Sequence, residues 1–297
     1  MSITTAMYSG VSGLLANAEG INVIGNNLAN VNTIGFKSGR ILFSDLLSAE
    51  GANNSQIGRG TQIQKIDNVY GQGAFETTEV VTDLAIQGNS FFALVAPNTT
   101  AALTNQSQAY LTRAGAFRVN NNYNLVNPEG YETISSNGGV PIKFARVDGA
   151  TAGDFQKVTS IDSRGVITYV DYAGNSFYYN GSGAFLAANA ANYATVLAAG
   201  NTIAVVNPSN PLGLQKVGGT LFRSTAESGI PTGAFTTASN QTNGNSEKLY
   251  SNSLENSNVD MAAQFVKMIL TQRAYSANAK TITTSDEMTQ EVLTLKR

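Results

Sequence analysis

The sequence contains no histidine and no cysteine. The usual ligands of zinc and iron–sulfur sites are therefore missing, and the Ser-His-Asp and Cys-His arrangements of nucleophilic catalysis are excluded. Without cysteine no disulfide can form, so cysteine pairing says nothing about the compartment in which the protein works. We expect neither a metal nor another cofactor, and no enzymatic activity.

Charge is also scarce, because only 13% of the residues are charged and the net charge is −2. Lysine and arginine are scattered singly, which leaves no basic stripe for nucleic acid and no polybasic patch for a membrane surface. No stretch approaches the roughly 20 apolar residues that span a bilayer. The first residues lack the basic and apolar regions of a secretory signal peptide, so we expect any export to proceed without a cleaved signal.

Proline is confined to the interior, since residues 1–96 and 232–297 contain none and are free to be helical. In the first of these ends, apolar residues alternate at spacings of four and three, which predicts a helix of about 25 residues with one apolar seam. This seam consists of Met7, Val11, Leu14, Ala18, Ile21, Gly25 and Leu28. Gly10, Gly13, Gly20 and Gly25 each weaken such a helix by about 1 kcal/mol relative to alanine, so it needs a partner.

The C-terminal end repeats the same spacing. Its seam consists of Met261, Phe265, Met268, Gln272, Tyr275, Ala279 and Ile282, and it resumes one step out of register at Met288, Val292 and Leu295. Asn258 and Asp260 are suitable N-terminal caps for this helix. Two helices of this kind at opposite ends favour pairing with each other and with further copies of the chain.

Helical periodicity disappears between the two ends. Short strands are predicted at 62–66, 83–87, 90–95, 165–172 and 203–206, separated by glycine- and asparagine-containing turns. The composition of 147–199, rich in Ala, Gly, Asn and Tyr, leaves the fold of that stretch open. The sequence therefore predicts a β-rich domain inserted between two helical ends.

An acidic cluster in the interior offers the main alternative. Glu76, Glu79 and Asp83 could in principle supply the paired carboxylates of glycoside hydrolysis, but their spacing carries little information and one water-exposed face of a strand explains them. The sequence therefore leaves three classes open. These are a self-assembling structural protein, an exported hydrolase or glycan-binding β protein, and an adaptor built on two helices.

Several segments resemble the flagellar rod and hook family. The run 26–37 is similar to the signature of that family, and its matching residues are Asn26, Asn27, Asn30, Asn32, Thr33, Gly35, Phe36 and Lys37. Segments 57–61, 72–78, 82–92 and 111–117 continue the resemblance, with a departure at Ser90, where a glycine is common. Gln272 and Arg273 match the C-terminal helix of the family.

The resemblance implies an α+β fold with discontinuous terminal helices. Residues 1–33 with 256–297 would pair as coiled-coil-like helices in an inner tube, 34–75 would form an extended connector, and 76–255 an outer β-rich domain. Weak helices of this kind should gain their order only on assembly. The residues expected to carry self-assembly are Met7, Val11, Leu14, Ala18, Ile21, Leu28, Met261, Phe265, Met268, Tyr275, Ala279 and Ile282.

The function implied is a subunit of the flagellar hook, a curved, flexible tube that acts as a universal joint between rod and filament. The alternative is a distal rod subunit of the basal body. A short segment between Leu47 and Gly60 favours the hook, whereas the chain is too short for the additional outermost domain of many hook proteins. The implied partners are further copies, the distal rod protein, the hook cap, the hook–filament junction protein and the type III export apparatus, and the implied location is the flagellum outside the cell.

Overall fold

A computed structural model gives the fold as two compact units. Unit 1 comprises 1–32, 37–70 and 259–297, and unit 2 comprises 33–36 and 71–258. The structure describes residues 3–46, 49–50, 56–97, 99, 102–144, 154–181, 185–236, 240–245 and 247–295. Helices at both ends flank a β-rich interior, which confirms the α+β class.

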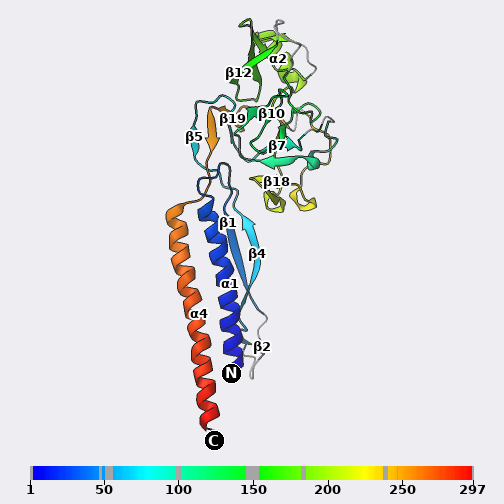
Figure 1. Cartoon of the computed structure of the whole chain (residues 1–297). Coiled ribbons are helices and arrows are strands. Elements are labelled where there is room, and N and C mark those ends of the chain that lie inside the picture. The colour runs from blue at the N-terminus through cyan, green and yellow to red at the C-terminus, as the bar shows by residue number, and fades with distance from the viewer. Residues whose placement is uncertain are drawn as a thin grey trace. The chain divides into compact units, whose positions relative to one another are not determined.

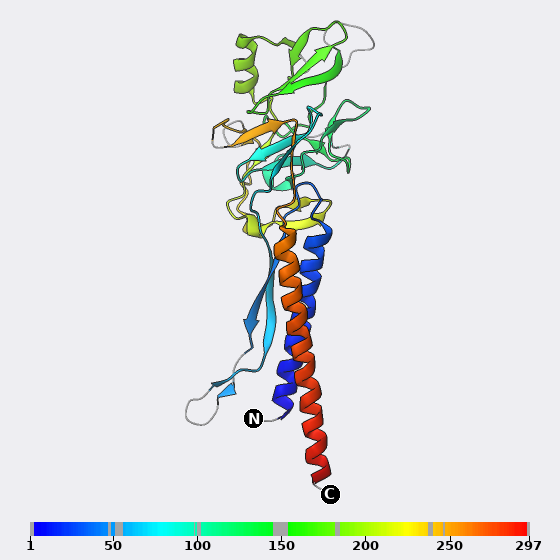
Figure 2. The same ribbon diagram turned by 90° about the vertical axis from the view of Figure 1, so that its left-hand side faces the viewer.

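Unit 1 contains two long helices, α1 (Ile3–Ala29) and α4 (Met261–Leu295). Both views show them side by side, with the C-terminal end of α4 extending beyond the N-terminal end of α1 (Figures 1 and 2). They are antiparallel, because Gly10 lies against Ile282 and Asn27 against Gln264. The Asp260 carboxylate accepts a hydrogen bond from the backbone N–H of Ala263 at 3.2 Å, which confirms the predicted cap of α4.

The expected connector contributes to unit 1 as well. Strands β1 (Gly39–Asp45) and β4 (Thr61–Asn68) form an antiparallel two-stranded ribbon with a bulge between Leu42 and Phe43. The ribbon lies along α1, since the backbone N–H of Thr61 donates to the Ser12 hydroxyl at 3.3 Å. Strands β2 (Ala49–Glu50) and β3 (Gln56–Ile57) also pair. Residues 47–48 and 51–55 of the segment between Leu47 and Gly60 lie outside the described residues.

Unit 2 is built on antiparallel pairing. Its largest sheet has the order β17-β18-β8-β7-β11-β10-β9, with β16 also pairing with β7. The strands of this sheet are β7 (Phe91–Val95), β8 (Tyr110–Thr112), β9 (Arg118–Val119), β10 (Leu125–Val126), β11 (Glu132–Thr133), β16 (Val205–Val206), β17 (Gln215–Gly218) and β18 (Leu221–Arg223). Two further pairs are β6 (Leu84–Gln87) with β19 (Lys248–Ser251), and β5 (Phe75–Thr77) with β20 (Ser253–Glu255). Three single 3-10 turns, η2 (Gln106–Gln108), η3 (Pro211–Gly213) and η4 (Ala226–Ser228), lie between these strands.

A second sheet occupies part of the stretch that the sequence left open. Its order is β12-β13-β14-β15, formed by β12 (Phe155–Ile161), β13 (Ile167–Asp171), β14 (Ser176–Tyr178) and β15 (Leu186–Ala187). Helix α2 (Ala190–Ala199) follows, between the Asn189 side chain, which accepts from the Asn192 N–H, and Gly200 at φ 72°. An alanine-rich run bounded by asparagine and glycine is the sequence signal for this helix. Residues 147–153 and 182–184 lie outside the described residues.

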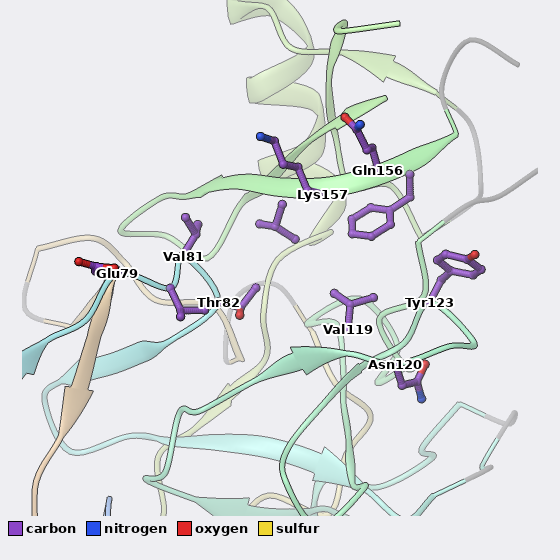
Figure 3. A pocket seen from close by; sticks show the side chains of 11 residues that line it. Glu79, Val81, Thr82, Val119, Asn120, Tyr123, Gln156 and Lys157 are labelled. Carbon is purple, nitrogen blue, oxygen red and sulfur yellow. The ribbon is translucent and has the colours of Figure 1, made fainter. Parts of the chain in front are cut away.

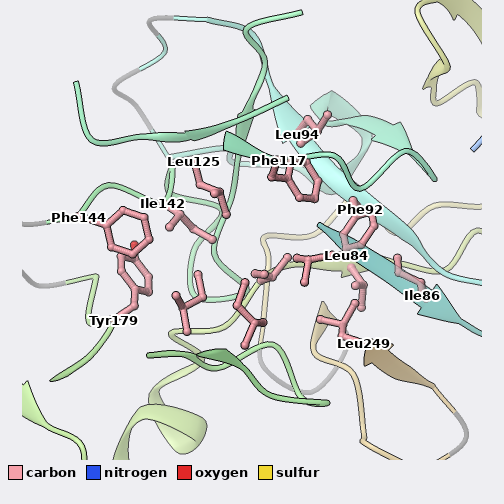
Figure 4. Packing of buried hydrophobic residues seen from close by; sticks show 14 of the residues in the cluster. Leu84, Ile86, Phe92, Leu94, Phe117, Leu125, Ile142, Phe144, Tyr179 and Leu249 are labelled. Atoms are coloured by element: carbon pink, nitrogen blue, oxygen red, sulfur yellow. The ribbon is translucent and has the colours of Figure 1, made fainter. Parts of the chain in front are cut away.

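One apolar core joins the two sheets of unit 2 (Figure 4). Phe92 meets Phe117 edge to face at 5.1 Å between ring centroids, and Phe144 stacks on Phe155 at 4.4 Å. Strands β4, β6, β7, β13 and β16 confirm the five strand predictions. Among the described residues, no helix combines the length and the apolar character that a membrane crossing requires.

Candidate assembly surface on the terminal helices

Helix α1 meets α4 through glycine. A Cβ atom added to Gly10 would lie 3.0 Å from the Ile282 side chain, and one added to Gly13 would lie 2.8 Å from the amide of Asn278. A Cβ on Gly20 would lie 3.3 Å from Thr271, whereas Gly25 has nothing within 4 Å. Three of the four glycines that weaken the isolated helix therefore let the two helix axes approach each other closely.

The face of α4 that receives these glycines is largely polar, apart from Ile282 opposite Gly10. Gln264, Thr271, Asn278 and Ser285 recur at intervals of seven residues, and Gln264 and Ser285 are buried. A spacing of seven keeps side chains on one side of a helix. The helices thus pair with each other as predicted, but through glycine and small polar groups rather than through the two apolar seams.

The predicted seams are only partly covered within the chain. Ile282 reaches Gly10, and Met268 and Ala279 are half-buried, but Val11 is 42% exposed and Phe265 is 45% exposed. The other predicted self-assembly residues are half-buried at Met7, Leu14, Ala18, Ile21 and Leu28 and exposed at Met261 and Tyr275. The seam of α1 lies beside the face that contacts α4, because successive residues turn about 100° around a helix.

Large apolar side chains are exposed on both helices, and some of them lie outside the predicted seams. The α1 outer face consists of Tyr8, Val11 and Leu15. The α4 outer face consists of Phe265, Val266, Ile269 and Leu270, and Met288, Val292, Leu293 and Leu295 are exposed near the C-terminal end of α4. Neighbouring apolar pairs such as Leu14 with Leu15 could have revealed them, since they widen the stripe beyond a single seam. Exposed apolar side chains grouped in this way make these faces a candidate protein interaction surface.

Asn27 of the motif fixes the far end of the helix pair. Its side-chain amide donates to the Gly39 carbonyl and accepts from the Gly39 N–H, both at 2.8 Å, and it donates to Gln264 at 3.4 Å. Only 2% of Asn27 is exposed. One side chain therefore joins α1, β1 and α4.

The other motif residues have separate places. Asn30 bonds back to Asn26 where α1 ends, and Lys37 is buried. Gly35 has a left-handed conformation at φ 69°. The Lys216 ammonium lies 4.7 Å from the ring centroid of Phe36 within unit 2. Thr33 is half-buried, and the exposed motif residues are Asn26, Asn32, Gln272 and Arg273.

The acidic cluster does not form a catalytic pair. Asp83 is buried and makes an ion pair with Arg118 at 2.5 Å, and Glu76 accepts a hydrogen bond from Asn256. Glu79 lies on the rim of an open groove with Val81 and Lys157 (Figure 3). Each carboxylate thus has different surroundings, and the part of the chain that the structure describes holds no group of three metal-ligating side chains.

Comparison with known proteins identifies the family. A model for flagella basal body rod proteins matches residues 7–37, the flagellar hook protein FlgE/F/G D1 domain matches 85–169, and the flagellar basal body rod FlgEFG protein C-terminal domain matches 250–295. The rod protein FlgG of Bacillus subtilis is 35% identical over 98% of this chain and 99% of its own length. FlgG of Borreliella burgdorferi is 29% identical over 98% of the chain. The hook protein FlgE of that organism is 41% identical over 135 residues, which cover 41% of this chain and 28% of the hook protein.

The chain belongs to the flagellar rod and hook family of the basal body, and it is a structural protein rather than an enzyme.

Proposed function

We propose that the chain is a distal rod subunit that polymerises into a helical tube. The observation that supports this most is its collinear similarity to rod proteins over 98% of its length. The hook, which the sequence favoured, remains the second candidate because of the 41% identity to a hook protein over 135 residues. That similarity covers only 28% of the hook protein, so most of the hook protein has no counterpart in the match.

Assembly would cover the α1 and α4 outer faces. Burying these faces between copies stabilises the assembly by about 25 cal/mol for every Å² of apolar surface removed from water. In the polymer we assign the paired helices to the inner tube, where they would make coiled-coil-like contacts with neighbouring copies. We assign the ribbon β1–β4 to the connector and unit 2 to the outer domain. Among the predicted self-assembly residues, the most available for this contact are Val11, Phe265 and Met261, since each is exposed in the single chain.

For the distal rod, the partners would be further copies and the axial proteins that precede and follow it, with delivery by the type III export apparatus to a site outside the cytoplasm. The hook cap and the hook–filament junction protein would be partners only if the chain forms the hook.

Electron microscopy of concentrated protein tests the assembly surface. The unaltered chain should form hollow tubes, and Leu15→Lys and Leu270→Lys should prevent them because a charge would be buried between copies. Gln215→Lys adds the same charge at an exposed position of β17 in unit 2, outside the two outer faces, and should still give tubes. Normal tubes from both leucine variants would contradict the proposal.

The shape of the tubes separates the two candidates. Straight, stiff tubes are expected for a rod subunit, and curved tubes that bend under load for a hook subunit. Uniformly curved tubes would move the assignment to the hook while leaving the assembly surface unchanged.

A further inference from the structure

The chain crosses between the two units at four places, after residues 32, 36, 70 and 258. On the unit 2 side of these crossings, three separate segments are bound to one another. The Gly35 N–H donates to the Glu255 carbonyl at 2.7 Å, and the Asn258 N–H donates to the Phe36 carbonyl at 3.4 Å. The Asn256 N–H donates to the Ala74 carbonyl at 2.9 Å. All four crossings therefore begin or end at one backbone cluster.

A buried ion pair lies beneath this cluster. The Glu255 carboxylate accepts from the Gly73 N–H at 2.9 Å and from the Arg113 guanidinium at 3.2 Å. Glu255 is 0% exposed and Arg113 is 2% exposed. The charge of each is thus removed from water and balanced by the other.

Arg113 connects the cluster to the sheet. Its guanidinium donates to the Gly88 carbonyl at 2.7 Å and to the Ile86 carbonyl at 3.4 Å, and it lies 4.9 Å from the ring centroid of Phe91. Burial lowers the pKa of Arg113, and the neighbouring Glu255 opposes that shift. The pair therefore ties the crossing segments to the β6–β7 turn.

Two glycines allow the segments to approach this closely. A Cβ on Gly73 would lie 2.0 Å from the Asn256 carbonyl oxygen, and one on Gly35 would lie 2.4 Å from the Ala114 backbone nitrogen. No other residue fits at either position without moving backbone. The backbone segments at Gly35 and Gly73 are consequently packed so closely that a single substitution can separate them.

We infer that Arg113 and Glu255 are positioning residues that fix the directions in which the chain leaves the β unit, and so set how stiffly the two units are joined in a tube. The part concerning tubes rests on the proposed function. The joint itself, by which we mean the bonded segments 33–36, 71–74 and 255–258 together with Arg113, is a property of the single chain. Removing the Glu255 charge should release 33–36 and 71–74 while the sheets of unit 2 stay folded.

Hydrogen–deuterium exchange on the full-length monomer tests this inference. In Glu255→Gln the amides of Gly35, Gly73 and Asn256 should exchange roughly tenfold faster or more, whereas those of β7 should not change. Arg118→Gln is the matched control, because it breaks the Asp83 ion pair of the same unit without touching the crossings. Unchanged exchange at Gly35 and Gly73, or equal acceleration throughout β7, would overturn the inference.

A double variant covers the case in which Glu255→Gln does not fold. Arg113→Met with Glu255→Leu replaces the buried pair by apolar groups, an exchange that proteins often tolerate. Faster exchange at Gly73 is still expected, because its carboxylate acceptor is gone, and unchanged exchange would refute the role of the pair. Tubes of this variant should bend more easily than Arg118→Gln tubes. If the unaltered chain forms no tubes, the proposed function fails, but the exchange result still decides the joint.

Discussion

At the scale of single residues, asparagine and glycine of the motif make close contacts with the backbone. Asn27 satisfies both backbone groups of Gly39 with one amide, which few other side chains can do. Gly35 takes a left-handed conformation against the backbone of Ala114. The motif is therefore explained by close backbone contacts.

The first prediction concerns Asn27. Asn27→Ala should destabilise the helical unit by about 1–3 kcal/mol, because both backbone groups of the half-buried Gly39 lose their partner. Thermal dissociation of assembled tubes, followed by light scattering, measures this loss. Asn22→Ala is the control on the same helix, since the exposed Asn22 side chain bonds only to Glu19 one turn away. Equal dissociation temperatures for the two variants would show that the Asn27 side chain does not hold α1, β1 and α4 together.

The second prediction concerns Tyr179. Burial raises the pKa of Tyr179 to about 12 from an ordinary value of 10.0. The unfolded chain loses this phenol proton first, so the stabilising contribution is complete below pH 10 and is lost as the pH rises towards 12. Tyrosinate absorbance should then rise together with loss of β-sheet circular dichroism. Tyr179→Phe should make the stability of unit 2 fall less steeply in that range, and an unaltered slope would be contrary to this account.

At the scale of elements, the same residue type has opposite effects at different positions of α1. Gly13 faces Asn278, whereas Gly25 faces no atom within 4 Å. The helix propensity of glycine is equally poor at both positions, so only the surroundings distinguish them.

The third prediction uses this contrast. Gly25→Ala should stabilise α1 by up to about 1 kcal/mol, because alanine is the better helix former and meets no neighbour. Gly13→Ala should gain less or lose stability, since its Cβ must displace the Asn278 amide. Helical circular dichroism during thermal unfolding compares the two variants directly. A larger gain from Gly13→Ala would show that the helices do not approach as closely as described.

At the scale of the whole molecule, apolar surface is distributed unevenly. Unit 2 contains the buried core, whereas the pairing of α1 with α4 buries chiefly glycine and polar groups and leaves the outer faces exposed. A helix pair with so little apolar burial has a low local stability. Covering by neighbouring copies would supply what the single chain lacks.

The fourth prediction follows from this distribution. In the monomer, amides of α1 and α4 should exchange quickly and those of the unit 2 core slowly. In tubes the helical amides should become protected, with the core unchanged as an internal reference. Hydrogen–deuterium exchange followed by mass spectrometry measures both states. Helices already protected in the monomer would mean that their order does not depend on assembly.

Much of the secondary structure and the broad class of the protein could be predicted from the sequence. Two proline-free ends with seven-residue periodicity predicted the terminal helices, alternating strands between turn residues predicted the β interior, and missing histidine and cysteine excluded whole classes of chemistry. Each of these is a local property, because helix and strand periods and ligand inventories are read along the chain.

Only the tertiary structure decided which faces meet. The apolar seams did not reveal the contact within the chain, because a glycine row lets helix axes approach only where a matching face lies opposite, and that match depends on residues more than 200 positions apart. The joint of Gly35, Gly73, Arg113 and Glu255 has the same origin. Its members carry no shared pattern along the chain, and their proximity is set by the sheets that bring them together.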